Sequence, residues 1–438
     1  MKQGEAEPPT MVAPRFHHFA AGAWINDPVG LHRQDGLWVL HDQRSTGADD
    51  RAIGWGRATS PDLLHWTDEG IAIPPEADGW IYSGCVVPDG ARTIAFFTFH
   101  RPSSGLQSQV SARWLGSWQR TPGECVSGRR DTRDPFVFRW GDEWRMLLAQ
   151  PPPWDAPTAY RSSLTLLASA DLGHWTDLGS IGPPSDLGEM FETPFLRRVP
   201  VAGESQERWP WLLGVGVVDR RIGAVCGTRA WLGRFDGCAF AEAGASFRLD
   251  HGPDFYAPAV WAGTDEPDVV LTGWCNSWAY ARRLPHTGWS GGAHALPRRL
   301  SAVRGETGWS LRQLPAALPG TGPHQDLASG VHQVAPQVIL TVEGTGCARL
   351  GDLTLTIAAD ALTLERETAT PALADSGFAG RWTVEHKGQP LVWLIDGCVA
   401  ELYSRDGAVW LTALTLRSAN QPLHLGEGLR ATLRSVSE

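Results

Sequence analysis

Three carboxylates of the sequence each stand beside a proline. Asp27 and Asp134 directly precede a proline, and Glu192 precedes one by two residues. Cleavage of a glycosidic bond needs one carboxylate that attacks the sugar or activates water and one carboxylic acid that protonates the leaving group, and a third can orient sugar hydroxyls. Arg133 next to Asp134 would hold that carboxylate ionised by its opposite charge, unless the two form only a surface ion pair. The alternative interpretation is that each carboxylate merely caps or tightens the turn at its proline.

The spacing of five polar residues favours the catalytic interpretation. Asp27, Ser83, Asp134, Glu192 and Asp254 each stand just before or within an apolar stretch, and successive members are 56, 51, 58 and 62 residues apart. A β-propeller blade has four strands in roughly 40 to 50 residues plus loops, and its innermost strand lines the central channel. Five near-equal steps therefore predict five blades whose innermost strands bring these residues to one pocket.

A repeated heptapeptide is consistent with the same period. Residues 62–68, DLLHWTD, recur with one change as residues 171–177, DLGHWTD, 109 residues later. That separation is about two blades, so the repeat would mark alternate blades. A duplicated turn in a sandwich, or chance, would give the same pattern.

Short apolar runs bounded by Gly, Pro, Asp or Arg fill the sequence, and helical periodicity is almost missing, which predicts an all-β protein. The Pro- and Gly-rich residues 314–323 have the composition of a linker, and alternating strands such as residues 338–342 and 391–395 follow it. We therefore expect a five-bladed β-propeller in residues 1–318 and a C-terminal β-sandwich in residues 319–438.

The composition narrows the class of ligand. The net charge is −10 and no run of Lys or Arg is longer than a pair, so we expect no nucleic-acid partner and no anionic membrane partner. The chain has 22 Trp against 5 Tyr, together with 49 Gly and 32 Pro. Flat apolar rings with a polar edge suit sugar faces, and frequent turn residues suit many short strands. These features favour a carbohydrate as the ligand.

The seven cysteines include no C-x-x-C pair and no ligand spacing with His, so we expect neither a disulfide framework nor a zinc site. Residues 1–15 lack the apolar run of a secretory signal, and no stretch approaches ~18 apolar residues. Together these features predict reduced thiols and a soluble, cytoplasmic protein.

The motifs occur in an order that resembles glycoside hydrolase family 32, the family of invertases, β-fructofuranosidases, inulinases and levanases. The resemblance runs through most of the chain and extends into the predicted sandwich. The segments that carry it are His17-His18-Phe19, Trp24-Ile25-Asn26-Asp27-Pro28, Trp55-Gly56-Arg57 through His65-Trp66, Tyr82-Ser83-Gly84, Arg133-Asp134-Pro135, Phe191-Glu192-Thr193-Pro194, residues 252–258, Gly273-Trp274, Leu296-Pro297-Arg298, Leu314-Pro315 and Ile395-Asp396 through Glu401-Leu402-Tyr403.

The resemblance implies a five-bladed propeller followed by a sandwich, a retaining mechanism, and no metal or other cofactor. By position, Asp27 would be the nucleophile, Glu192 the general acid and then base, and Asp134 the residue that stabilises the transition state. The family positions that line the fructose pocket match Asn26, Gln43, Trp55, Ser83, Arg133 and Trp274.

The sequence also departs from the family pattern. Val29 replaces the usual Asn or Cys, residues 41–43 lack an aromatic before Gln, and Arg57 replaces a usual His. Thr193 stands where the family has Cys, and this change beside Glu192 is expected to alter the pH optimum.

We therefore predict a cytoplasmic retaining β-fructosidase that hydrolyses terminal β-D-fructofuranosyl bonds of sucrose or short fructo-oligosaccharides, with a small sugar as its substrate and neither nucleic acid nor membrane as a partner. Three rivals remain: a fructosyltransferase on the same scaffold, a five-bladed pentosidase, and a catalytically silent fructan-binding protein. Substrate length, β-2,1 against β-2,6 linkage and oligomeric state are open.

Overall fold

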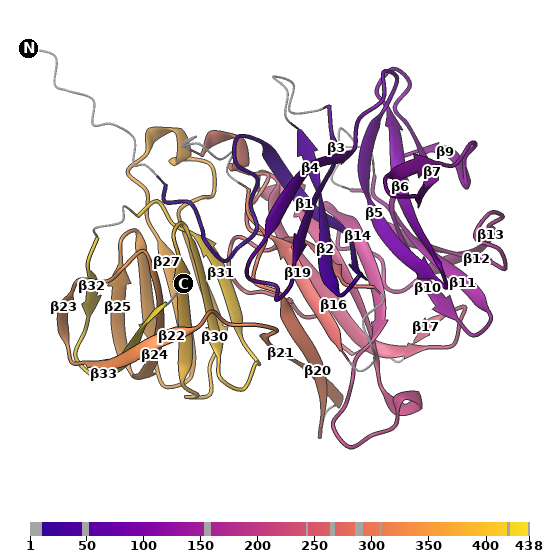
Figure 1. Cartoon of the computed structure of the whole chain (residues 1–438). Helices are drawn as coiled ribbons and strands as arrows, with labels where there is room; N and C mark the ends of the chain where they lie inside the picture. The colour runs from indigo at the N-terminus through magenta and orange to yellow at the C-terminus, as the bar shows by residue number, and fades with distance from the viewer. Residues whose placement is uncertain are drawn as a thin grey trace, which may run out of the picture.

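The computed structural model consists almost entirely of antiparallel strands (Figure 1). Its helices within the described residues are four single 3-10 turns, η1 (Gln206–Arg208), η2 (Arg220–Ile222), η3 (Ala281–Arg283) and η4 (Pro371–Leu373). The all-β prediction is confirmed, and no helix in this part of the chain is long and apolar enough to cross a membrane. The structure describes residues 11–45, 52–152, 159–241, 244–262, 268–284, 292–306, 308–417 and 421–436.

The described residues between Trp24 and Pro315 form five successive sheets, each made of consecutive strands that pair antiparallel. The first holds β1 (Trp24–Gln34), β2 (Leu37–Ser45), β3 (Gly54–Ser60) and β4 (Thr67–Ile73); the second β5 (Trp80–Asp89), β6 (Arg92–Arg101), β7 (Leu106–Trp114) and β8 (Trp118–Arg120), with β9 (Val126–Arg130) also paired to β7. The third holds β10 (Arg133–Trp140), β11 (Glu143–Gln150), β12 (Ser163–Ser169) and β13 (Thr176–Ile181); the fourth β14 (Glu189–Arg198), β15 (Trp211–Asp219), β16 (Val225–Phe235) and β17 (Phe240–Ala241); the fifth β18 (Tyr256–Val260), β19 (Val269–Trp274), β20 (Arg298–Gly305) and β21 (Gly308–Pro315).

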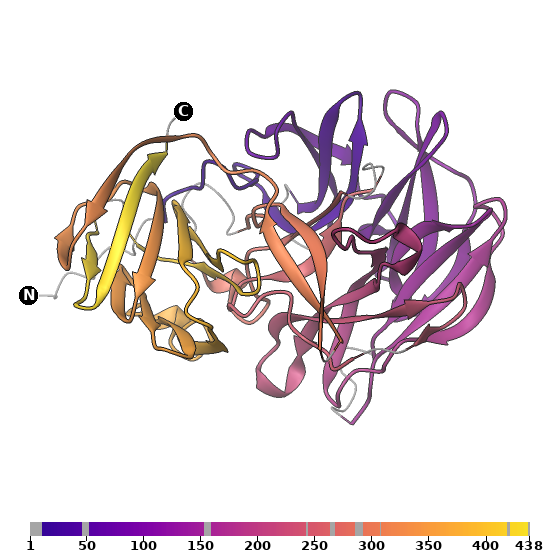
Figure 2. The ribbon, with the colours of Figure 1, turned by 90° about the horizontal axis from the view of Figure 1, so that it is seen from below.

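The first strands of the five sheets form a closed ring. β1 contacts β5, β5 contacts β10, β10 contacts β14, β14 contacts β18, and β18 contacts β1. Around this ring the sheets pack on one another through both faces, so the inner part of β6, for example, is buried at six successive positions, Ile94–Phe99. This burial on both faces is why the strands read as continuous apolar runs in the sequence. The view from below shows the ring beside the C-terminal sheets (Figure 2).

Every first strand carries a β-bulge at the same place. A bulge re-aims a side chain, and it also accepts proline, which has no N–H for the ladder. Prolines accordingly occupy the bulges of β1, β10, β14 and β18. The register shifts lie between Ile25 and Pro28, Ile81 and Gly84, Arg133 and Phe136, Glu192 and Phe195, and Tyr256 and Ala259.

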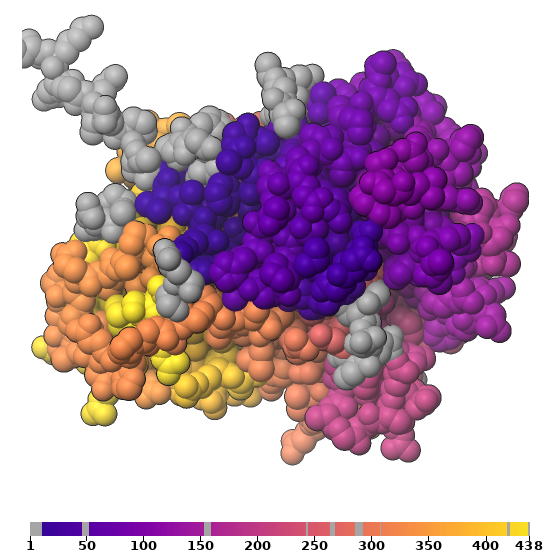
Figure 3. All heavy atoms as spheres, viewed as in Figure 1, coloured from indigo at the N-terminus to yellow at the C-terminus, as the bar shows by residue number. Residues whose placement is uncertain are grey.

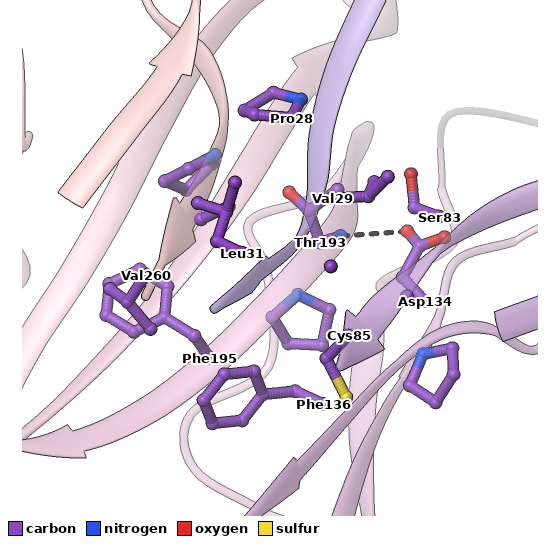
Figure 4. Close-up of a pocket in the computed structure, with 16 residues that line it drawn as sticks. Pro28, Val29, Leu31, Ser83, Cys85, Asp134, Phe136, Thr193, Phe195 and Val260 are labelled. Atoms are coloured by element: carbon purple, nitrogen blue, oxygen red, sulfur yellow. Dashed lines mark hydrogen bonds between the residues drawn. The ribbon is translucent and has the colours of Figure 1, made fainter. Parts of the chain in front are cut away.

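Beyond the bulges, the first strands line a narrow channel. Figure 4 shows this channel, with apolar side chains such as Val29, Phe136 and Val260 converging from different strands and Asp134 at its polar end. Most of the residues that line the channel are apolar, and its polar residues include Ser83, Asp134 and Thr193.

The repeated heptapeptide forms equivalent turns in two sheets. One copy joins β3 to β4 and the other joins β12 to β13, in the first and third sheets. In both copies the Asp side chain accepts hydrogen bonds from the backbone N–H groups two and three residues on: Leu64 and His65 for Asp62, and Gly173 and His174 for Asp171. The repeat thus marks alternate sheets, as predicted.

The remaining strands form two six-stranded sheets that share one apolar core, as in a β-sandwich. The predicted boundary at residue 318 falls between β21 and β22. In pairing order, one sheet holds β22 (Thr321–Leu327), β33 (Leu429–Val436), β24 (Gln337–Gly344), β29 (Leu391–Asp396), β30 (Val399–Ser404) and β31 (Trp410–Leu414), and the other holds β23 (Gly330–His332), β32 (Leu423–Leu425), β25 (Gly346–Leu350), β26 (Leu353–Ile357), β27 (Ala361–Arg366) and β28 (Gly380–Glu385).

Candidate active site

A cavity of about 470 Å³ opens at the N-terminal ends of the first strands, where the central channel begins. All three predicted catalytic carboxylates, Asp27, Asp134 and Glu192, line it. Three of the predicted binding residues, Asn26, Gln43 and Arg133, line it as well, whereas sequence reasoning did not identify the remaining lining residues: Ile53, Trp80, Tyr82, Gln107, Asp131, Trp278 and Arg282.

Asp27 is held by side-chain donors on both oxygens. Asn26 Nδ2 donates to Oδ1 at 3.1 Å, while Ser83 Oγ and Gln43 Nε2 donate to Oδ2 at 2.6 and 3.2 Å. Burial and the nearby charge of Glu192 raise the pKa of Asp27 to about 6, against the effect of these hydrogen bonds. The carboxylate is therefore fixed in orientation but poorly solvated, which favours its reactivity as a base or nucleophile.

Asp134 sits in the bulge of β10 with a left-handed backbone, φ 62°. Its Oδ2 accepts a hydrogen bond from the Thr193 N–H at 2.8 Å, drawn as a dashed line in Figure 4. Burial and the charge of Glu192 raise the pKa of Asp134 to about 7, although Arg133 acts in the opposite direction. Arg133 thus favours the ionised form of Asp134, as expected, but burial and Glu192 outweigh its effect on the pKa.

The Arg133 guanidinium turns instead to Glu192. Its Nε and Nη2 donate to Glu192 Oε1 at 3.0 and 2.8 Å, and the Tyr256 hydroxyl donates to Oε2. Burial opposes the charge of Arg133, yet Glu192 and Asp134 hold its pKa above the usual value. Tyr256 is itself fully buried, and burial and Glu192 hold the pKa of its hydroxyl well above the usual range, so it stays a proton donor.

Three predicted pocket residues lie behind the cavity wall. Ser83 reaches the site through Asp27 and Gln43, to which it is hydrogen-bonded. Trp55 is completely buried, and its Nε1 donates to the Tyr82 carbonyl at 2.9 Å. Trp274 is also completely buried, against Trp278, which does line the cavity. Neither Trp55 nor Trp274 is among the residues that line the cavity, and both pack under residues that do.

Asp254 does not join the other four polar residues at the site. It precedes β18 and is completely buried. Its Oδ2 pairs with Arg366 Nη1 at 2.5 Å and accepts the Leu414 N–H at 2.7 Å, and its Oδ1 accepts the Tyr280 hydroxyl, so it faces the sandwich. The fifth strand supplies Tyr256 instead.

Tyr256 was missed because the period was read from polar residues with Asp254 as its fifth member. The prolines of the bulges carry the clearer signal, since Tyr256 stands two residues before Pro258 as Glu192 stands two residues before Pro194. Bulge position, not charge, fixes which residue of the fifth strand reaches the carboxylates, since Tyr256 contacts Glu192.

Aromatic side chains form two walls of the cavity. Tyr82 stacks on His100 with ring centroids 4.8 Å apart, and Trp278 stacks on Trp24 at 6.2 Å. Arg282 and Asp131 add charge to the lining. Ring faces beside paired carboxylates suit a ligand with apolar faces and many hydroxyls, as sugars have.

No group of three or more His, Cys, Asp or Glu side chains suited to a metal ion occurs in the described part of the chain, and all seven cysteines are free.

Comparison with known proteins places these features in a family. The N-terminal domain model of glycosyl hydrolases family 32 matches residues 17–315. A levanase of Bacillus subtilis is 28% identical over 326 residues, which cover 69% of this chain and 46% of the levanase. An extracellular exo-inulinase of Aspergillus niger is 28% identical over 340 residues, with coverage of 66% and 61%. The chain thus spans about half to three fifths of the length of these relatives.

Solved structures show the same fold. An exo-inulinase from Aspergillus awamori superposes with a TM-score of 0.81 at 22% identity, covering 97% of this chain and 98% of that one. A β-fructofuranosidase from Schwanniomyces occidentalis, complexed with fructosyl-erythritol, gives 0.83 at 18% identity, covering 99% of each chain.

The relatives do not support every prediction. The Aspergillus niger relative is named an extracellular enzyme, so the comparison gives no support to the cytoplasmic location expected from residues 1–15. The family assignment itself rests on a match over more than half of the chain, from His17 through β21, the last strand of the fifth sheet. The chain belongs to glycoside hydrolase family 32.

Proposed function

We propose that the protein is a retaining β-fructosidase that releases terminal β-D-fructofuranosyl units from sucrose or short fructo-oligosaccharides. The observation that carries the proposal is the meeting of Asp27, Asp134 and Glu192 in one cavity, each from the bulge region of a different first strand. Two groups of donors, one around Asp27 and one around Glu192, give the two carboxylates different surroundings, as a nucleophile and an acid/base require.

In the first step the Asp27 carboxylate attacks the anomeric carbon of the fructosyl unit. The bond to the leaving oxygen breaks as Glu192 transfers its proton to that oxygen, which leaves a fructosyl ester on Asp27 and an ionised Glu192. Arg133 binds Glu192 Oε1, so Oε2, which meets Tyr256, is the oxygen assigned to carry the proton.

In the second step water attacks the anomeric carbon and gives a proton to Glu192, the bond from that carbon to the Asp27 oxygen breaks, and fructose leaves with both carboxyl groups restored. Asp134 is assigned to the fructose hydroxyls, where hydrogen bonds strengthen as positive charge develops on the sugar ring. Asn26, Gln43 and Ser83 keep the Asp27 oxygens in place during both steps.

We further propose that the five sheets are the blades of a five-bladed β-propeller covering residues 1–318, with the sandwich in residues 319–438. The closed ring of first strands and the bulge repeated in all five sheets support this division.

The test is sugar release from sucrose, kestose, inulin and levan, with glucose and fructose counted separately. A hydrolase releases the two sugars from sucrose in equal amounts, whereas glucose in excess of fructose would indicate a fructosyltransferase. Binding of fructosides without any turnover would favour the silent binding protein.

Two variants test the roles of the carboxylates. Asp27→Ala should abolish turnover without unfolding the protein, because no ester can form. Glu192→Gln should slow both steps, and a fructosyl fluoride, whose leaving group needs no protonation, should restore part of the first. Near-normal turnover by Asp27→Ala would refute the assignment of the nucleophile.

A further inference from the structure

The sandwich reaches toward the catalytic centre through one buried carboxylate, Glu401 of β30. Its Oε2 lies 3.0 Å from His17 Nε2 and accepts the Leu296 N–H at 3.1 Å, while its Oε1 accepts Arg298 Nη2 at 2.9 Å. Glu401 is completely buried. A single carboxylate of the sandwich therefore binds two separate stretches of the part of the chain that forms the five sheets. We call residues 15–18 the N-terminal segment and residues 292–298 the return segment.

Asp396 at the end of β29 anchors the N-terminal segment beside Glu401. It accepts the backbone N–H groups of Arg15, Phe16 and His17 at 2.8, 2.7 and 3.1 Å, and its Oδ2 lies 2.7 Å from His17 Nδ1. The indigo chain in Figures 1 and 3 accordingly runs from the sandwich to the ring.

The N-terminal segment leads to one support of Asp27. His18 Nε2 lies 3.1 Å from Asp42 Oδ2, and the next residue of β2 is Gln43, which donates to Asp27 Oδ2. Asp42 is completely buried, and Arg44 also binds it.

The return segment leads to the other support. His294 Nε2 donates to the Asn26 carbonyl at 2.7 Å, and the Asn26 side chain donates to Asp27 Oδ1 at 3.1 Å. The segment lies so close to β1 that a Cβ on Gly292 would stand 2.3 Å from the carbonyl oxygen of Ile25.

A backbone hydrogen bond joins the two segments, from His294 N–H to the His18 carbonyl at 2.9 Å. Asn26 and Gln43, the two amides that hold Asp27, are thus each braced by one of the segments that meet at Glu401 Oε2. All links of both paths are buried, so water cannot replace a lost one cheaply.

We propose that Glu401 is a positioning residue for Asp27: by binding the N-terminal and return segments together, the sandwich sets the nucleophile's geometry. The inference rests on the proposed role of Asp27 in fructoside cleavage. Because a misplacement of about 1 Å at a reacting group costs about 100-fold in rate, Glu401→Gln should lower kcat by about 10- to 100-fold with a smaller change in KM.

The pH profile separates positioning from a change of charge. Removing the negative charge of Glu401 would by itself lower the pKa of Asp27, whereas loosening Asn26 removes a hydrogen bond that now lowers it. Glu192, Asp134 and Arg133 face the same cavity and are unchanged in the variant. We expect the acid limb of kcat/KM to move to higher pH, the direction that only loosening explains.

Three variants frame the experiment. Glu401→Asp keeps the charge that balances Arg298 and His17 but withdraws the oxygen from Leu296, so it should fold and show the same loss. His294→Ala removes only the hydrogen bond from the return segment to the Asn26 carbonyl. Leu355→Ala, in the core of the sandwich and away from both segments, is the control for general destabilisation and should keep the wild-type kcat well below its melting temperature.

Hydrogen exchange supplies a readout that needs no activity. In Glu401→Gln and Glu401→Asp, peptides covering residues 15–27 and 292–298 should exchange faster, while Leu355→Ala should affect only sandwich peptides. The double variant Glu401→Asp with His294→Ala should lose little more activity than the worse single variant, because both act on one path.

Folded Glu401 variants with wild-type kcat, acid limb and exchange would overturn the proposal, as would additive losses in the double variant. If the wild type turns over no fructoside but the exchange pattern appears, the proposed function fails and the coupling stands. If the wild type is active and the Glu401 variants match it, the coupling alone fails.

Discussion

Two carboxylates of the cavity, Asp27 and Asp134, are buried beside Glu192, and each keeps its proton to higher pH than an ordinary aspartate. The physical cause is the same for both: burial penalises the charged form, and a second negative charge nearby penalises it further. The donors differ, however, since Asp27 has three side-chain donors and Asp134 receives a backbone N–H from Thr193.

The pH dependence of the reaction should report this environment. Asp27 must be ionised to attack, and its pKa is about 6 and that of Asp134 about 7, so kcat/KM should fall as the pH drops through about 7 to 6. Because the carboxylates interact, the acid limb reports the titration of the interacting carboxylates together and not the pKa of one residue. Measuring kcat/KM from about pH 4 to about pH 9 checks this, and a limb near ~4, the value of an ordinary carboxyl, would contradict it.

Ser83→Ala tests the same acid limb of kcat/KM, and the direction of its shift can be stated in advance. The Ser83 hydroxyl stabilises the ionised form of Asp27, so its loss should raise the pKa of Asp27 and move the acid limb further up. A limb that stays in place would show that Asp27 does not control it.

Tyr256→Phe tests the residue that the sequence did not reveal. It removes the hydroxyl from Glu192 Oε2, and hydrogen bonds to charged groups contribute about 1.5 to 3 kcal/mol, so kcat should fall by about 10- to 100-fold. Tyr160→Phe, at an exposed position, is the matched control and should be neutral. Equal activity of the two variants would remove Tyr256 from the site.

At the scale of the strand, the bulge is the feature that assembles the site. It lets Asp134, Thr193 and Ala257 adopt left-handed backbones, with φ of 62°, 46° and 47°, and so re-aims the residues around them. A branched residue such as Thr193 is strained in this region, so the surrounding strand must hold it there.

The neighbouring strand makes room for this bulge. Gly216 of β15 pairs with Glu192, and a Cβ at Gly216 would stand 2.9 Å from Thr193 Oγ1 and 3.0 Å from the Tyr256 ring. Gly216→Ala should therefore displace both side chains and lower kcat by about tenfold, with a loss of about 1 to 3 kcal/mol in the free energy of unfolding. Gly227→Ala on β16, where a Cβ meets open space, should change neither kcat nor stability as much; similar effects at both sites would refute the steric argument.

The geometry of the strands also explains which site residues could be predicted from the sequence and which could not. The carboxylates and Arg133 were predictable because each lies in a short motif with a proline. Trp55 was misplaced because sequence does not show that Gly30 leaves room for its ring beneath the first strand, 2.8 Å from where a Cβ would be. Asp254 was misplaced because the register of β18 begins two residues later, at a position fixed by packing against the sandwich.

At the scale of the whole molecule, two buried ion networks join the ring to the sandwich. One centres on Asp254 and Arg366, and the other on His17 with Asp396 and Glu401. Breaking one partner of such a buried pair leaves an uncompensated charge, so this junction is expected to contribute to the stability of both parts.

Alkaline pH should weaken this junction. Burial disfavours the charge on His17, but the hydrogen bonds and charges of Asp396 and Glu401 prevail and raise its pKa to about 9. A raised folded-state pKa adds stability that is complete below the unfolded value of about 6.5 and is lost as the pH rises through about 9. The melting temperature should therefore fall across that range in the wild type.

The control for that prediction is His17→Gln, which cannot titrate. Its melting temperature should be lower at pH ~7 and should change less up to pH ~9. An identical pH dependence in wild type and variant would exclude His17 as the cause.

The bond between Asp396 and the Arg15 backbone spans 381 residues, and this has a consequence for synthesis on the ribosome. The N-terminal segment is made before its acceptors on Asp396, roughly 20 to 80 s earlier at ordinary elongation rates. β18 is complete well before Asp396, so β1 can close against it, but the N-terminal segment cannot pack on the sandwich during that interval. Phe16 and Leu64, which pack against Ile339 and Val392 of the sandwich, therefore stay uncovered on the nascent chain until the sandwich has been made, and a slowed ribosome or an early stop would present them to chaperones and to other chains.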